Sequence, residues 1–146
     1  MIKLNKIKTK TNIITIAYIV GIILDGLMGL DMFLYTFLGN SIFLQSQNIP
    51  ISNSSTQPVM MLGTALMIGW TVLLLWGVQK PIERKGTLII TAFPVVFLYL
   101  VYDIFQYINV NTSSIFSILI IRCCLIILLI MAYIFANQIK DTNKKN

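Results

Sequence analysis

The chain has 146 residues, enough for one domain, and 57% of them are hydrophobic while only 11% are charged. A soluble domain carries roughly 25% charged residues, so this chain has too little charge to cover a surface that faces water. Its net charge of +6 lies mostly in short segments outside the apolar blocks, which argues against a nucleic-acid partner and favours contacts with the membrane surface.

Four apolar segments are long enough to cross a bilayer as helices. The hydrocarbon core is about 30 Å thick, and a helix that crosses it needs about 20 mostly apolar residues. Alternating strand patterns are absent, and the open edge of a sheet cannot be satisfied in lipid. The sequence therefore predicts an all-α fold, an integral membrane four-helix bundle in a single domain over 1–146, with spans near 11–30, 58–78, 87–108 and 115–136.

The first apolar segment starts after a basic stretch, as a signal peptide does. No clear small-x-small cleavage site follows it, and Asp25 interrupts the apolar run. We therefore expect a helix that is retained in the membrane.

The loop 31–57 follows the first span and has two parts. The apolar part, 32–44, either extends the first helix or lies flat at the outer membrane interface. The second part, 45–57, is rich in Ser, Asn and Gln and predicts an exposed loop.

The positions of Lys and Arg predict the direction of the spans, because positively charged loops stay in the cytoplasm. Loops 31–57 and 109–114 contain no Lys or Arg, whereas both termini and the loop between the second and third spans are basic. We therefore expect a multi-pass protein of the cell membrane with both termini cytoplasmic, and anionic lipid as a partner at the inner face. The basic residues are Lys3, Lys6, Lys8 and Lys10; Lys80, Arg84 and Lys85; and Lys140, Lys144 and Lys145.

Small residues in the first two spans are expected to serve as helix contacts. Side chains of this size let helix backbones approach closely in lipid. These residues are Gly21, Gly26 and Gly29 in the first span, and Ala65 and Gly69 in the second.

Pro94 lies inside the third span. Proline removes one backbone hydrogen bond, so we predict that it kinks this helix. Such a kink either opens a pocket or, as in many membrane helices, has no further role.

Three ionisable residues lie within the spans: Asp25, Asp103 and Arg122. At 1.5 Å per residue, they are about 9, 8 and 10 Å inside the outer ends of their helices, and so at similar depth. An unpaired charge in hydrocarbon costs several kcal/mol. We therefore predict an ion pair between Asp103 and Arg122, with Asp25 completing a charged layer.

Further polar residues are expected beside this layer. Tyr99, Gln106 and Tyr107 share a helix face with Asp103, and Asp31 lies at the mouth of the layer. Two interpretations remain open. The layer is either a salt bridge that fixes helix order, or a small polar pocket that opens outward and binds a polar group or passes protons.

The middle of the chain carries a family resemblance. Gly69-Trp70, then Lys80-Pro81-Ile82-Glu83-Arg84-Lys85-Gly86, then Thr91 and Pro94, together resemble small four-helix membrane proteins grouped near the DoxX-like families. The resemblance covers about a third of the chain. It implies a four-helix bundle and assigns no functional residue.

No catalytic machinery is visible in the sequence. Phosphate loops, dinucleotide fingerprints and metal-ligand clusters are absent, and the chain has no His, so we expect neither cofactor nor metal. The sequence favours a non-enzymatic membrane factor or partner subunit, with a protein partner or a second copy of itself. The alternative is binding or transport of a small lipophilic or cationic compound through the polar pocket.

Overall fold

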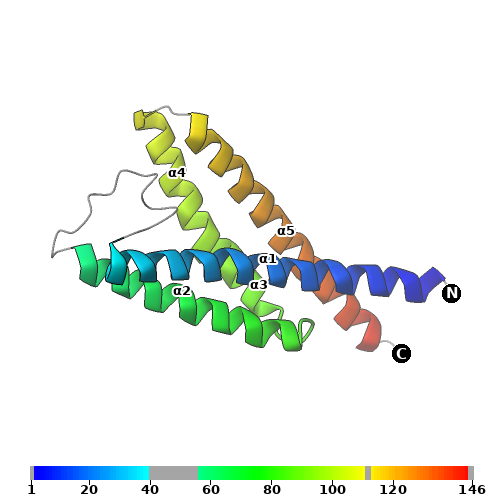
Figure 1. Cartoon of the computed structure of the whole chain (residues 1–146). Coiled ribbons are helices and arrows are strands. Elements are labelled where there is room, and N and C mark those ends of the chain that lie inside the picture. Colours follow the sequence, from blue (N-terminus) through cyan, green and yellow to red (C-terminus); the bar gives the residue numbers. More distant parts are fainter. Residues whose placement is uncertain (1, 40–55, 111–112, 145–146) are drawn as a thin grey trace. The chain divides into compact units, whose positions relative to one another are not determined.

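The described part of the chain is almost entirely helical in the computed structural model, which describes residues 2–39, 56–110 and 113–144 (Figure 1). No strand occurs among these residues. The elements are α1 (Ile2–Leu38), α2 (Thr56–Gln79), α3 (Gly86–Ile90), the π-helical segment η2 (Thr91–Val96), α4 (Phe97–Val110) and α5 (Ser113–Lys144). The segments α3, η2 and α4 follow one another directly as one run.

Among the described residues, four helices are long and apolar enough to cross a membrane, which confirms the predicted all-α fold with four apolar helices of membrane length. Each predicted span lies within one helical run. The candidate spans are Lys8–Leu38, Gln57–Gln79, Gly86–Asn109 and Phe116–Lys140.

The first helix is longer than the predicted span. Of the two alternatives for the apolar part of the loop, the structure has helix extension, because α1 continues through Leu38. Gly39 follows with a φ of 67°, and its N–H donates to the Tyr35 carbonyl at 3.1 Å. Glycine tolerates this left-handed conformation, which ends the helix. Positions 40–55, including most of the predicted exposed loop, lie outside the described residues.

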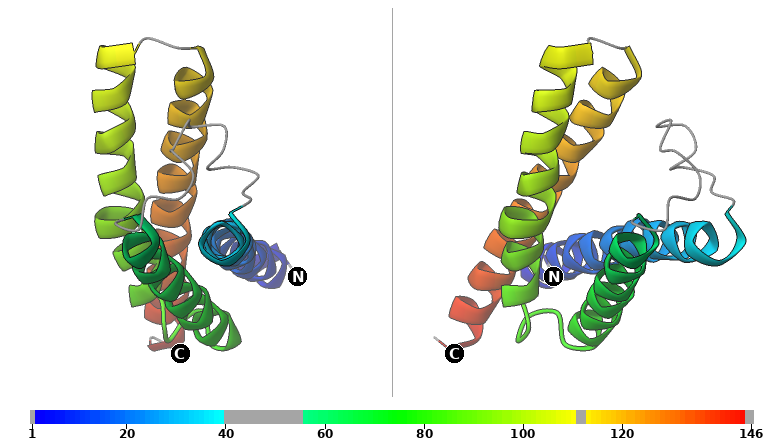
Figure 2. Two further views of the ribbon diagram at one scale, coloured as in Figure 1. Left: turned by 60° about the vertical axis from the view of Figure 1, so that its left-hand side comes forward. Right: turned by 90° about the vertical axis from the view of Figure 1, so that its left-hand side faces the viewer.

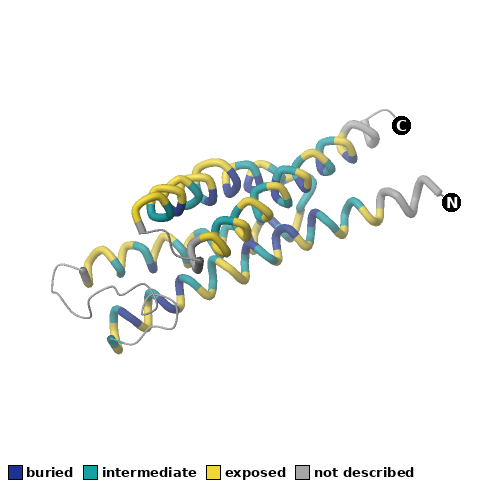
Figure 3. The backbone as a smooth tube through the Cα atoms, turned by 90° about the horizontal axis from the view of Figure 1, so that it is seen from above, coloured by how far each residue is buried: buried dark blue, intermediate teal, exposed yellow. Residues whose placement is uncertain are grey.

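The chain divides into two compact units. One contains Met1–Tyr18 and Gly77–Asn146, and the other contains Ile19–Trp76. We call them the paired-charge unit and the glycine unit, after the contacts described below. Buried and exposed residues alternate along their helices, as expected of helices with one packed face (Figure 3).

In the paired-charge unit, α4 and α5 lie side by side and antiparallel (Figure 2). The same α5 helix also contacts α3 and η2. Buried residues recur about once per turn on both sides of this contact, and several are small, which lets the helices approach. They are Leu88, Ala92 and Val96 on α3 and η2, and Leu129, Ala132 and Ala136 on α5.

In the glycine unit, α1 packs on α2 through its glycines. A Cβ added at Gly21 would lie 3.1 Å from Leu74 Cδ1, and one at Gly29 would lie 3.2 Å from Met67 Cβ. The predicted contact role of these two glycines is therefore confirmed. Gly69 on α2 differs, because an added Cβ would meet nothing within 4 Å there.

The third candidate span departs from α-helical geometry around Pro94. The segment η2 is π-helical, and at its end the Phe97 N–H bonds the Ala92 carbonyl, five residues earlier. Proline lacks an N–H and its ring crowds the carbonyl four residues before it, so a wider turn relieves both problems. A π-helical turn is a known cause of helix kinks.

Candidate functional site

The contact between α4 and α5 contains the predicted ion pair. Arg122 Nε on α5 lies 2.5 Å from Asp103 Oδ2 on α4, and the two side chains are 24% and 10% exposed. Asp103 is about 10 Å from the end of α4, and Arg122 is about 14 Å from the start of α5, at 1.5 Å per residue. The antiparallel arrangement therefore brings the two residues together.

An aromatic ring completes the surroundings of the guanidinium. The Arg122 guanidinium carbon lies 4.5 Å from the centre of the Tyr99 ring, one turn before Asp103 on the same helix. The electron-rich face of such a ring attracts a cation. Asp103 Oδ2 receives no aligned hydrogen bond from a described residue, so the contact acts through charge at short range. The carboxylate and the guanidinium neutralise each other, which leaves little net charge for a ligand.

The other two residues predicted on this helix face have different contacts. The Gln106 side-chain amide donates to the Tyr102 hydroxyl at 2.6 Å. The Tyr107 ring lies 6.1 Å from the Phe116 ring, centre to centre. Of the predicted polar stripe, the structure thus joins only Tyr99 to the ion pair.

Asp25 and Asp31 belong to the glycine unit. Asp31 is 3% exposed. Asp25 is partly buried, and its Oδ2 is buried without a hydrogen-bond partner among the described residues.

Asp25 was predicted at the depth of the ion pair on the expectation that the first helix ends near residue 30. Because α1 continues to Leu38, Asp25 is about 20 Å from that helix end rather than about 9 Å. The corresponding distance for Asp103 on α4 is about 10 Å. Equal depth therefore no longer supports a three-residue layer, and the membership of Asp25 in it stays a prediction.

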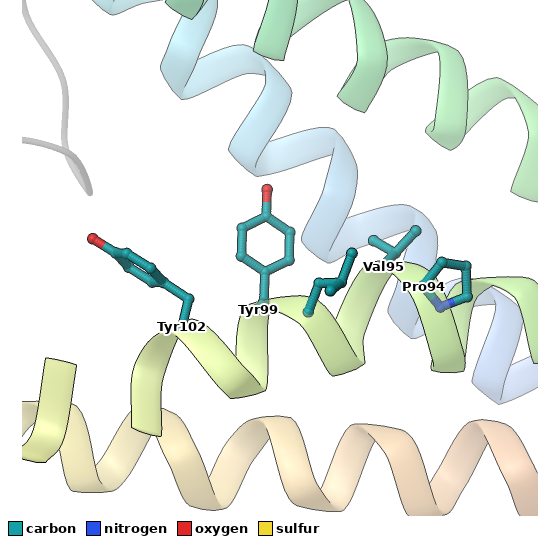
Figure 4. Close-up of a pocket in the computed structure, with 5 residues that line it drawn as sticks. Pro94, Val95, Tyr99 and Tyr102 are labelled. Atoms are coloured by element: carbon teal, nitrogen blue, oxygen red, sulfur yellow. The ribbon is translucent and has the colours of Figure 1, made fainter. Parts of the chain in front are cut away.

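A shallow groove of about 440 Å³ runs along η2 and α4. It is lined by Pro94, Val95, Leu98, Tyr99 and Tyr102. Figure 4 shows these side chains along the ribbon, with both tyrosine hydroxyl groups turned away from α5. The lining is largely apolar, so the groove suits a lipophilic group better than a strongly polar one.

A second polar cluster was not predicted from the sequence. The Tyr18 hydroxyl lies 2.7 Å from Thr87 Oγ1 and donates to the Arg84 carbonyl at 2.9 Å. A Cβ added at Gly77 would lie only 2.5 Å from the Tyr18 ring, so this position has no room for a side chain. Tyr18 looks like one apolar residue among many. Nothing in the local sequence marks it as the partner of a threonine that follows the basic loop.

Two lysines are held against the last turns of α5. The Lys85 ammonium donates to Asn137 Oδ1 and lies 5.9 Å from the Tyr133 ring centre. Lys10 pairs in the same way with the amide oxygen of Gln138 and lies over the ring of Phe135. These partners are neutral, so they do not compensate the charge of either lysine.

Comparisons of the chain with family models, with curated proteins and with solved structures gave no match. The resemblance to proteins near the DoxX-like families therefore stays a prediction. The fold by itself defines the class: within the part of the chain that the structure describes, it is a helical protein with four helices long and apolar enough to span a membrane.

Proposed function

We propose that this is a multi-pass protein of the cell membrane with both termini cytoplasmic, and that it acts without catalysis as a membrane factor or partner subunit. The observation that carries the proposal is the ion pair of Asp103 and Arg122. Because the two charges neutralise each other between α4 and α5, they serve to hold the helices rather than to perform chemistry.

Exposed apolar side chains support a role in contacts with other helices. Large ones lie along each spanning helix, such as Leu66, Phe105 and Ile121, which are 65%, 65% and 59% exposed. Lipid or the helices of a partner can cover such surfaces, and van der Waals packing stabilises the second arrangement.

The test of this function is mass spectrometry of the protein purified in mild detergent. A partner subunit is expected to appear as a stable complex, either with a second copy or with another membrane protein. A chain that is monomeric after chemical cross-linking in native membranes would contradict the proposal.

The proposed orientation has its own test. Reporters fused at Glu83 and at the C-terminus are expected to read inside, because the flanking basic residues are held in the cytoplasm. Reporters at Asn53 and Asn111, which lie outside the described residues, are expected to read outside. An inside signal at Asn53 together with an outside signal at the C-terminus would overturn the orientation.

Anionic lipid at the inner face is part of the proposal. Lys10 and Lys85 are oriented by neutral amide oxygens and aromatic rings, so their charges remain available to phosphate headgroups. Phosphatidylglycerol is expected to stay bound more than phosphatidylcholine in native mass spectra, and Lys85→Gln should reduce the difference. Equal retention of both lipids would contradict this point.

A second candidate function is the binding of a small lipophilic or cationic compound. The groove at Pro94 favours it, because an apolar lining lies beside two tyrosine hydroxyl groups. Leu98→Trp should fill the groove and reduce binding of a lipophilic dye. Phe105→Trp is the matched control, since Phe105 lies on the same helix, is equally exposed and does not line the groove. Equal binding by both variants would exclude the groove as the site.

A further inference from the structure

Asp25 lies on the glycine face of α1. Gly21 and Gly29 are each four residues away from it, and residues with this spacing share one side of a helix. Both glycines contact α2, with added Cβ atoms only 3.1 Å from Leu74 and 3.2 Å from Ile68. Asp25 therefore lies at the centre of the contact between α1 and α2.

The neighbouring part of α2 offers little to a carboxylate. Thr71 is at the level of Gly26, since a Cβ there would lie 3.5 Å from Thr71 Cγ2. The Thr71 hydroxyl, however, donates to the Met67 carbonyl at 2.8 Å. Its proton is thus already used within α2. Asp25 Oδ2 remains buried without a hydrogen-bond partner among the described residues.

The glycine unit also lacks a compensating cation. Between Ile19 and Trp76 the sequence contains no Lys, Arg or His. The ionisable residues of α1 in this unit are Asp25, Asp31 and Tyr35, and the part of α2 in this unit has none. An ionised carboxylate in such surroundings is strongly unfavourable, whereas the protonated acid is tolerated and can donate a hydrogen bond.

We infer that Asp25 is a proton-binding site within the membrane, a carboxyl group that takes up and releases a proton near the middle of α1. Its ligand is the proton, and the glycines on either side keep the backbone of α2 close to it. Asp103 is the counterpart whose charge is compensated, by Arg122. The inference rests on the proposed membrane placement, but it needs neither a protein partner nor a bound compound.

A site of this kind has a functional consequence. A carboxyl group that exchanges a proton inside a bilayer can couple proton movement to a change in helix packing. The glycine contacts make the packing of α1 on α2 sensitive to the volume and charge at this position. If the compound bound in the second candidate function is also transported, such coupling would supply the driving ion.

The test uses the full-length protein in liposomes. Infrared spectra of wild type and of each variant are compared at neutral pH. Wild type is expected to show the carbonyl band of a protonated carboxylic acid, and Asp25→Asn should lose it. Asp103→Asn is the matched control, the same substitution at a paired carboxylate, and should keep the band. A spectrum that Asp25→Asn leaves unchanged would show that Asp25 is ionised and would overturn the inference.

Labelling by an apolar carbodiimide gives a second measurement. The reagent takes the proton of a neutral acid on one nitrogen, and the carboxylate oxygen bonds to its central carbon. Peptide mass spectrometry should find the adduct on Asp25 and none on Asp103. Arg122→Gln is the control for access, because it should make Asp103 reactive as well. If the reagent labels Asp103 in Arg122→Gln but does not label Asp25, the result would contradict a proton-binding site at Asp25.

Stability separates the proton site from a structural charge. Asparagine resembles the protonated acid in shape and charge, so Asp25→Asn should leave the melting temperature in detergent unchanged. Asp103→Asn should lower it by several degrees. Equal losses in the two variants would mean that Asp25 is ionised and compensated like Asp103. Failure of the partner and orientation tests would leave these three measurements unaffected, so the two proposals fail separately.

Discussion

The two compact units bring helices together by different means. In the paired-charge unit, α4 and α5 are joined by Asp103, Arg122 and the ring of Tyr99. In the glycine unit, α1 approaches α2 through glycines, and no cation accompanies Asp25. Helices in lipid lack a hydrophobic driving force for association, so either charge or close shape must supply it. The same residue type, aspartate, therefore has opposite roles: one holds the structure, and we propose that the other exchanges a proton.

The largest effect is expected from Arg122→Ala in the paired-charge unit. Removing one member of a buried pair leaves the other charge uncompensated, which costs about 3–5 kcal/mol. We expect about 3 kcal/mol, because the pair is partly exposed. The measurement is unfolding of the purified protein in mixed detergent.

The double variant Arg122→Leu with Asp103→Leu sharpens this prediction. It removes both charges, so it should cost less than the sum of the two single changes. Additive losses would show that the two residues do not interact. Should the double variant keep partner binding, the pair is purely structural.

A smaller effect is expected from Gly29→Ala in the glycine unit. The new methyl group would lie 3.2 Å from Met67 Cβ and 3.4 Å from the Ile68 backbone nitrogen. A backbone atom cannot relieve such a contact by changing rotamer. Overpacking of this kind costs about 1–2 kcal/mol. Gly69→Ala is the control, because its methyl group meets nothing within 4 Å. A comparison of detergent melting curves tests this, and equal losses at both positions would refute close packing at Gly29.

The smallest effect is expected from Pro94→Ala in the paired-charge unit. Alanine restores the missing N–H, so η2 should return toward α-helical hydrogen bonding. The change in stability should be small, because the π-helical turn already relieves the clash of the proline ring. Backbone chemical shifts over Thr91–Val96 give the measurement. The prediction fails if the π-helical turn persists unchanged or if the protein loses much more stability.

The ion pair was predictable because it follows from the cost of placing one charged residue inside a span. An arginine inside a span needs a compensating acid. Asp103 lies on the preceding helix, which a short connection joins to the helix of Arg122. The end of α1 was not predictable, since Asp31, Tyr35 and Thr36 within an apolar stretch suit an interfacial segment as well as a helix. Burial of Asp31 and Tyr35, at 3% and 5% exposure, shows that packing accompanies the continuation.

The contact between Tyr18 and Thr87 was beyond the reach of the sequence for a related reason. These residues are far apart along the chain, and nothing in their local pattern marks them as partners. Asp25 is an intermediate case. Its spacing from Gly21 and Gly29 is visible in the sequence, but the fit of those glycines to Leu74 and Met67 is not.

The sequence by itself determined the four apolar helices and the need to compensate Arg122. Length and hydropathy are properties of a segment, and an unpaired charge in lipid is too costly whatever the fold. Only the tertiary structure decided that Tyr99 covers the guanidinium, that Gln106 turns to Tyr102, and that α1 packs on α2 through the face that carries Asp25. Those outcomes depend on which side chains meet across two helices, and the period of one helix carries no information about its neighbour.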